Sequence, residues 1–176
     1  MRICVIVTTY NRPDALAAAI DGYIEQDAGE FDLLVADDGS TEETRRLVED
    51  YARRTPFRLQ HVWQKDRGFR PGAARNRALA ATAAEYVSFS DGACVPPPRC
   101  VARQSERAAP GDFLAGTRIL LSERFTAEVL RWRLPIHAWS TGRWLGAWIR
   151  RDVNRALPLL SLPDGGFRSR TPHRWE

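Results

Sequence analysis

Residues 3–8, Ile-Cys-Val-Ile-Val-Thr, form an unbroken apolar run that ends in a hydroxyl side chain. A strand covered on both faces has this pattern, whereas a strand with one solvated face alternates apolar and polar residues. Asn11-Arg12-Pro13 ends the run, and Pro13 suits the first turn of a helix, which we expect from about Asp14 to Gln26. The run therefore predicts the central strand of a sheet with helices on both faces.

The same alternation of strand and helix continues along the chain. Residues 31–36, 59–63 and 86–89 read as further strands, and 113–121 as a fifth. Helices are expected from about 40 to 54, opened by a Ser40–Glu43 capping box, and over 73–84 and 99–109. Strands alternating with helices of about a dozen residues favour right-handed crossovers. The predicted fold class is α/β, with a mostly parallel sheet flanked by helices.

Charge and tryptophan are distributed unevenly. Residues 1–116 carry 15 basic and 17 acidic side chains, a net of −2, while residues 117–176 carry 11 and 5, a net of +6. The later part also holds five of the six tryptophans. We therefore expect two parts: a compact domain over 1–121 and a basic, mostly helical tail over 122–176, broken at Pro135, Gly142, Pro158 and Pro163.

The composition indicates where in the cell we expect the protein to be located. No signal peptide precedes the first strand, and no apolar run reaches the ~18 residues of a membrane span. Cys4, Cys94 and Cys100 are odd in number and lack metal-ligand spacing, which indicates reduced thiols. A cytoplasmic protein is expected.

Four polar segments follow the predicted strands: residues 8–12, 37–40, 68–75 and 91–93. In a parallel sheet these ends lie on one edge, where ligands usually bind. Tyr10 can lie against a flat base, and the Asp38 carboxylate can accept an N–H from a pyrimidine. Arg70 and Arg75 can hold a pyrophosphate, and Asp91 a ribose hydroxyl or a metal-bound water.

Each segment also has a purely structural interpretation. Asp37-Asp38-Gly39-Ser40 is a good turn, Asp91-Gly92 is a common tight turn, and arginines on a helix are usually solvated. His61, His137 and His173 are scattered and are expected to be structural. Order and spacing favour a site, because the four segments fall on consecutive strand ends.

The sequence disfavours a dinucleotide-binding fold and excludes a P-loop fold. No Gly-x-Gly-x-x-Gly follows the first strand, and no phosphate-binding Gly-x-x-x-x-Gly-Lys-Ser/Thr is present, Lys65 being the only lysine. A nucleotidyltransferase is also disfavoured, since it needs a glycine- and lysine-bearing loop after the first strand.

The chain resembles the inverting family 2 glycosyltransferases of the GT-A fold over about residues 2–120. The matching segments are residues 5–12 (VIVTTYNR), 34–41 (LVADDGST), 72–77 (GAARNR) and 85–91 (EYVSFSD). The resemblance implies that Thr9, Tyr10 and Asp38 hold the nucleobase, usually uracil, that Arg75 reaches the diphosphate, and that Asp91 contacts the ribose and the metal. The candidate nucleotide-sugar-binding residues are Thr9, Tyr10, Asn11, Asp38, Arg70, Arg75 and Asp91.

Two departures from the family pattern bear on activity. The family's Asp-x-Asp normally binds Mg²⁺ or Mn²⁺ through its last Asp, and here Ala93 stands at that position, leaving Asp91 as the one candidate metal ligand. The family's general base, an Asp or Glu in a downstream segment, has no counterpart before Glu176, and neither Asp152 nor Asp164 has a matching context. We therefore expect impaired activity and name no catalytic residue.

The tail mixes tryptophan with arginine over residues 130–151, a composition that suits a membrane interface or an anionic, lipid-linked acceptor. An ordinary helical hairpin that packs its tryptophans is the alternative. No nucleic-acid-binding module is recognisable.

The resemblance implies a hexosyltransferase of cell-envelope polysaccharide synthesis that moves a sugar from a UDP-sugar to a glycan or lipid-linked acceptor with inversion. Its expected location is the cytoplasm, at the inner face of the membrane. The alternative is a non-catalytic nucleotide-sugar-binding domain.

Overall fold

The structure is a computed structural model that describes residues 1–111, 113–154 and 168–169. The chain divides into two compact units, Met1–Ala102 and Arg103–Glu176. The division into 1–121 and 122–176 stays a prediction about domain organisation. Each unit is described by itself.

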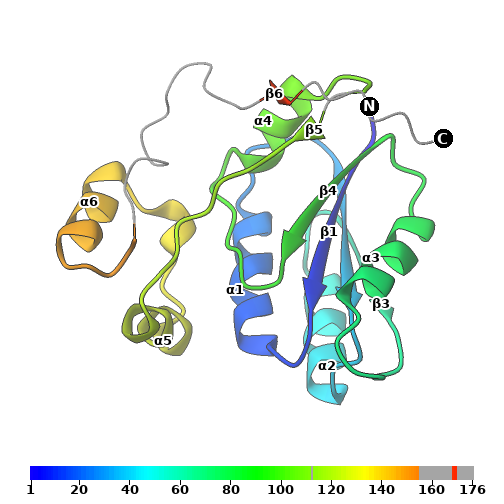
Figure 1. Cartoon of the computed structure of the whole chain (residues 1–176), viewed down its shortest axis with the longest axis horizontal. Helices are drawn as coiled ribbons and strands as arrows, with labels where there is room; N and C mark the ends of the chain where they lie inside the picture. The colour runs from blue at the N-terminus through cyan, green and yellow to red at the C-terminus, as the bar shows by residue number, and fades with distance from the viewer. Residues whose placement is uncertain (112, 155–167, 170–176) are drawn as a thin grey trace. The chain divides into compact units, whose positions relative to one another are not determined.

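The first unit is built on a four-stranded parallel sheet in the order β3-β2-β1-β4. The strands are β1 (Ile3–Thr9), β2 (Phe31–Asp37), β3 (Arg58–Trp63) and β4 (Tyr86–Asp91). The opening apolar run is thus an inner strand, and Figure 1 shows β1 beside β4 and pointing the same way.

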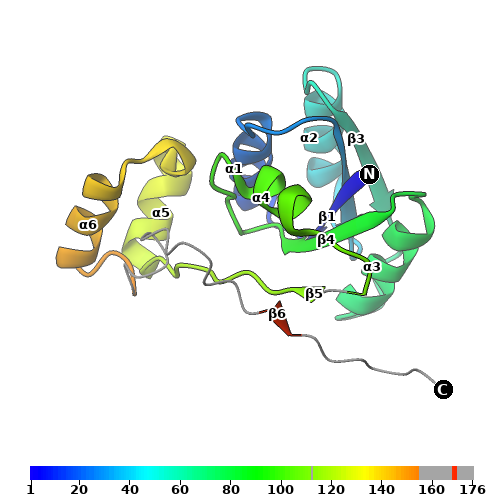
Figure 2. The same cartoon turned by 90° about the horizontal axis from the view of Figure 1, so that it is seen from above.

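Alternate residues of β1 face opposite layers because successive side chains of a strand point to opposite faces. Ile3, Val5 and Val7 belong to a core with α1 (Pro13–Ile24) and α2 (Glu42–Ala52), whereas Cys4 and Ile6 pack with α3 (Pro71–Ala80). Figure 2 shows α1 and α2 on one side of the strands and α3 on the other. The predicted parallel α/β sheet with helices on both faces is confirmed.

Three local predictions are corrected. The fifth strand spans two residues, β5 (Phe113–Leu114), and pairs antiparallel with β6 (Arg168–Ser169) in a separate small sheet. No capping box opens α2: Thr41 is the N-cap, and the Ser40 hydroxyl instead accepts a bond from the Asn11 backbone. Gly142 does not break a helix, because it lies inside α6 (Thr141–Ile149).

The remaining helices are α4 (Cys100–Arg107), α5 (Glu123–Trp132) and the short 3₁₀ helix η1 (Ile136–Ala138). Serine hydroxyls cap α5 and α6: Ser122 accepts from the Phe125 N–H at 3.2 Å, and Ser140 from the Arg143 N–H at 3.4 Å. The predicted breaks at 158 and 163 lie outside the described residues. No described helix is long and apolar enough to cross a bilayer.

Candidate functional site at the carboxyl edge of the sheet

The strand register brings the predicted strand-end residues to one edge. Thr8 of β1 is opposite Asp91 of β4, and Thr9 is opposite Asp37 of β2. Asp37 in turn is opposite Trp63, the last residue of β3. All four strands therefore end at the same level, and the loops that follow them adjoin one another.

Asp38 joins two of these loops. Its carboxylate accepts bonds from Gln64 Nε2 and from the Arg70 backbone N–H, both at 2.6 Å, and its own N–H donates to the Thr9 carbonyl at 3.0 Å. Asp38 is only 3% exposed. Each carboxylate oxygen can accept more than one bond, so the group keeps acceptor capacity beside these partners.

Asp37 holds the turn beneath Asp38. Its Oδ1 accepts from the N–H groups of Gly39 at 3.2 Å and Ser40 at 2.8 Å, and its Oδ2 lies 2.8 Å from His61 Nε2. Burial favours the neutral acid, but the bonds from His61 and Ser40 outweigh it, and the pKa of Asp37 is lowered. His61 thus supports the turn, which agrees with its structural interpretation.

Gly39 allows the β2–α2 and β3–α3 loops to meet. Its φ is +102°, and a Cβ there would lie 2.5 Å from the Cα of Asp66. Any other residue would push the two loops apart.

Tyr10 and Asn11 fasten the β1–α1 loop to its neighbours. The Tyr10 hydroxyl donates to Asp66 Oδ2 at 3.0 Å, a bond that raises the tyrosine pKa, while 48% of the residue stays exposed. Asn11 has φ +48°, and its Oδ1 accepts from the Thr41 N–H at 3.0 Å. Thr9 is buried, and no described residue hydrogen-bonds its hydroxyl.

Arg70 turns back onto its own loop. Its Nη2 donates to the Lys65 carbonyl at 2.8 Å, and its buried Nε has no partner among the described residues. Its backbone N–H, bound to Asp38, fixes the start of α3. Its predicted contact with a diphosphate stays a prediction.

Arg75 bridges β1 and β4 from α3. Its Nε donates to Thr8 Oγ1 at 2.8 Å, and a terminal nitrogen donates to Asp91 Oδ1 at 3.1 Å. Both charged side chains are well exposed, 39% for Arg75 and 49% for Asp91. A guanidinium is therefore held, open to solvent, beside the acid that closes β4.

The turn after Asp91 is pinned to β1. The Gly92 N–H donates to the Thr8 carbonyl at 2.7 Å, and a Cβ on Gly92 would lie 2.9 Å from that oxygen. Ala93, the next residue, is exposed. No group of three metal-ligating side chains occurs within the described part of the chain. Asp91 is engaged by Arg75, and the residue two positions later, Ala93, offers a methyl group in place of a second carboxylate, so this site does not fit the hard-oxygen donor set that a divalent cation prefers.

The residues at this edge fall into two groups, one around Asp38 and one around Asp91, which we call the Asp38 side and the Asp91 side. The Asp38 side consists of Tyr10, Asp37, Asp38, Gln64, Asp66 and Arg70; the Asp91 side consists of Thr8, Arg75, Asp91, Gly92 and Ala93. Sequence reasoning missed Gln64, Asp66 and the anchoring role of Thr8. Gln64 and Asp66 directly follow β3, so the rule that strand carboxyl ends carry ligand chemistry pointed to them.

An open parallel sheet with carboxylates and a guanidinium at its carboxyl edge is the arrangement of nucleotide-binding α/β proteins. The chain belongs to the glycosyl transferase family 2, whose family model matches residues 4–163. The resemblance seen in the sequence is thereby confirmed.

Individual relatives support this assignment. Validoxylamine A glucosyltransferase of Streptomyces hygroscopicus subsp. jinggangensis is 34% identical over 91 residues, which are 51% of this chain and 21% of that protein. The first curated relatives are matched over only 10–28% of their length.

Two solved structures share the fold. S. aureus TarS 1-349 in complex with UDP aligns with a TM-score of 0.53 and 29% identity, over 60% of this chain and 31% of that one. The mannosyltransferase PcManGT from Pyrobaculum calidifontis, solved with GDP-Man and Mn²⁺, aligns with a TM-score of 0.56 and 27% identity, over 74% and 38%.

Proposed function

We propose that this chain binds a UDP-sugar at the carboxyl edge of its sheet and serves a hexosyltransferase of cell-envelope polysaccharide synthesis. The observation that carries the proposal is the meeting of Tyr10, Asp38, Arg75 and Asp91 on one edge. The solved TarS complex with UDP supports a uridine donor, and the mannosyltransferase complex with GDP-Man supports the wider class of nucleotide sugars.

The Asp38 side is the proposed base site. The exposed face of Tyr10 offers a platform for a planar ring, and the carboxylate of Asp38 accepts the N3–H of uracil. Gln64 and the Arg70 N–H hold that carboxylate in one orientation, so no rotamer freedom is lost on binding. Cytosine has no N–H at this ring position, which predicts a preference for UDP over CDP.

The Asp91 side is the proposed diphosphate and ribose site. Arg75 offers a guanidinium to the diphosphate oxygens, and Asp91 accepts from a ribose hydroxyl. Because Ala93 replaces a carboxylate, we assign no step to a metal ion here. Arg75 then supplies positive charge to the leaving diphosphate.

The proposed transfer is a single in-line displacement with inversion. An acceptor hydroxyl oxygen attacks the anomeric carbon, the bond from that carbon to the phosphate oxygen breaks, and UDP leaves with the electron pair. The hydroxyl proton passes to a general base, and we assign that role to no described residue. The acceptor is a hydroxyl-bearing glycan or lipid-linked glycan.

A non-catalytic nucleotide-sugar-binding domain is the second candidate. Ala93 favours it, because loss of a charged stabiliser at a leaving group costs on the order of 10²–10³ in rate. The base site does not depend on residue 93, so binding survives where turnover does not.

Calorimetric titration with UDP, GDP and CDP, each with Mn²⁺ or with EDTA, tests the proposal. We expect UDP to bind most tightly, with little change on adding Mn²⁺. Absence of UDP binding would refute both candidates. Release of UDP from a UDP-sugar at a rate on the order of 1 s⁻¹ would contradict the impairment.

The membrane contact predicted for the tail is also a proposal. Leu145, Trp148 and Ile149 are 47%, 47% and 70% exposed, and their i, i+3, i+4 spacing places them on one face of α6, with Arg150 and Arg151 following. We expect co-sedimentation with vesicles containing phosphatidylserine and a weaker interaction with pure phosphatidylcholine. Equal co-sedimentation with both kinds of vesicle would contradict the proposal. So would binding to the vesicles that Ile149→Ser leaves unchanged.

A further inference from the structure

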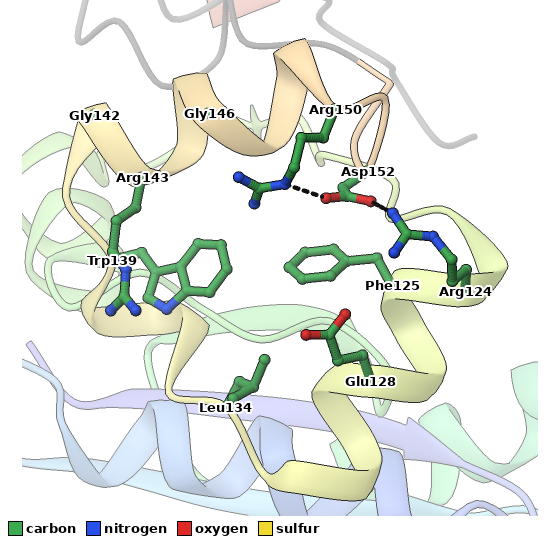
Figure 3. Close-up of a pocket in the computed structure, with 10 residues that line it drawn as sticks. All are labelled: Arg124, Phe125, Glu128, Leu134, Trp139, Gly142, Arg143, Gly146, Arg150 and Asp152. Atoms are coloured by element: carbon green, nitrogen blue, oxygen red, sulfur yellow. Dashed lines mark hydrogen bonds and ion pairs between the residues drawn. The ribbon is translucent and has the colours of Figure 1, made fainter.

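The second unit contains a cavity of about 640 Å³ that the nucleotide proposal does not use. It is lined by residues of α5, of α6 and of the segments beside them, and Figure 3 shows Phe125, Glu128 and Trp139 pointing toward its centre. This volume falls in the usual range for small-ligand sites, about 300–1,000 Å³. The lining mixes aromatic rings with charged side chains, so its chemistry restricts what it can hold.

Two aromatic rings form one wall. The centroids of Phe125 and Trp139 are 5.6 Å apart with planes at 40°, and Trp144 packs against Trp139 with centroids 5.3 Å apart. The Arg143 guanidinium lies 4.9 Å from the centre of the Trp139 ring. Trp139 is therefore held by neighbours on more than one side and keeps a fixed orientation beside the cavity (Figure 3).

A buried carboxylate braces the opposite wall. Asp152, with only 4% of its side chain exposed, pairs with Arg124 and with Arg150, whose Nε donates to Asp152 Oδ2 at 3.0 Å. The Asp152 carbonyl also accepts from the Ser122 N–H at 2.7 Å, which ties the end of α6 to the start of α5. Two of the three lining arginines thus share one carboxylate, which offsets part of their charge.

Glu128 is the one lining acid whose side chain no other described residue engages. In Figure 3 its carboxylate points from α5 toward the Phe125 and Trp139 rings. In the same view the Trp139 ring lies between Glu128 and Arg143, so an acceptor and a multiple donor flank this ring in the lining of the cavity.

We propose that this cavity binds a pyranose ring of a neutral glycan. A pyranose has apolar C–H faces that suit an aromatic wall and a rim of hydroxyls that both donate and accept. Glu128 accepts from such hydroxyls, and Arg143 donates to them. A purely apolar ligand would leave the charges of Glu128 and Arg143 without partners, and an anion would be repelled by the Glu128 carboxylate. A hydroxyl-rich, uncharged ligand satisfies every group in the lining.

This sugar is the acceptor of the transfer or an extension of the acceptor. That part of the inference rests on the proposed function. Binding of the sugar itself does not rest on it, because the cavity and the nucleotide edge share no residue. A chain that fails to bind UDP yet binds the sugar would refute the proposed function and leave this inference standing.

The test is titration of the full chain with methyl glycosides of glucose, galactose, mannose and N-acetylglucosamine, and with a β-linked glucose tetrasaccharide. Binding is followed by the ¹H–¹⁵N indole signals, which Trp139→Phe assigns. We expect the Trp139 indole to shift with at least one sugar and the exposed Trp132 to stay fixed. No shift with any sugar up to ~50 mM would overturn the inference.

Two variants separate a sugar site from other sites. Trp139→Ala should weaken sugar binding at least ~10-fold, whereas the matched control Trp132→Ala, outside the lining, should change it less than ~2-fold. Glu128→Gln, an exposed and shape-conserving change, should weaken sugar binding ~3- to 10-fold without unfolding the unit. If Glu128→Gln instead tightens binding of inorganic phosphate while sugar binding is unchanged, the cavity is an anion site and the inference is wrong.

Discussion

Around Asp38 nearly every polar side chain is already bonded to a neighbouring loop, whereas around Asp91 the paired charges of Arg75 and Asp91 stand partly exposed to solvent. The Asp38 side joins three loops, and Gly39 and Asp66 are in contact distance there. The Asp91 side depends on Arg75 and a pinned glycine turn. Preorganised groups bind with less entropic loss, so the two sides should respond differently to substitution.

This difference assigns recognition of the base to the Asp38 side and the chemistry at the leaving diphosphate to the Asp91 side. Groups that identify a base need fixed positions, while groups that meet a leaving diphosphate need charge. Ala93 leaves the Asp91 side with one carboxylate fewer and is not part of the Asp38 side. We therefore expect nucleotide binding to survive with slow turnover, and the following substitutions test that division from the largest effect to the smallest.

Asp38→Ala should have the largest effect. It leaves Gln64 Nε2 and the Arg70 N–H without their acceptor, which should lower the free energy of unfolding by about 3 kcal/mol. UDP affinity should fall at least ~100-fold, because the base partner and the loop geometry are lost together. Denaturant unfolding and calorimetry measure the two effects. Asp50→Ala, an exposed acid on α2, is the control, and comparable losses in that variant would contradict the assignment.

Arg75→Gln should weaken UDP binding ~10- to 100-fold with little change in stability, since the Arg75–Asp91 pair is solvent-exposed. The loss should increase from uridine to UMP to UDP, because the guanidinium is proposed to meet phosphate oxygens. Calorimetry with the three ligands measures this series. Arg77→Gln, an exposed arginine two residues further along α3, is the matched control. An equal loss for uridine and UDP would move Arg75 out of the diphosphate site.

Ala93→Asp should restore a metal dependence. The position is exposed, so the new carboxylate costs little to place, and it adds a second hard oxygen ligand two residues from Asp91. We expect Mn²⁺ to tighten UDP binding ~10-fold in the variant and less than ~2-fold in the unsubstituted chain. Ala93→Asn is the control, because asparagine is close to aspartate in size but carries no charge, so it separates the effect of charge from that of size. A strong Mn²⁺ effect without the substitution would show that Asp91 suffices, contrary to our view of the Asp91 side.

The sequence predicted the sheet because an inner parallel strand leaves an unmistakable apolar run, and strand ends follow from where such runs stop. It also placed Asp38, Arg75 and Asp91 at one edge for that reason. It did not predict that Ser40 bonds Asn11 instead of capping α2, since a capping pattern cannot tell which loop will approach the hydroxyl. The Glu128 cavity was equally hidden, because its residues come together only when α5, η1 and α6 pack.

Protonation of Asp37 at low pH should destabilise the Asp38 side. This is the smallest of the expected effects, because it is absent at neutral pH. The pKa of Asp37 is lowered in the folded chain, so its contribution to stability is complete above the unfolded value of about 4 and is lost as pH falls through the folded value. The free energy of unfolding should thus gain no dependence on this group between pH 7 and 5 and should decline below about pH 4. Asp37→Asn should flatten that decline, and Asp50→Asn should keep it. Urea unfolding between pH 3 and 7 measures the slopes, and parallel curves for Asp37→Asn and the unsubstituted chain would show that the bonds from His61 and Ser40 do not hold the Asp38 turn as described.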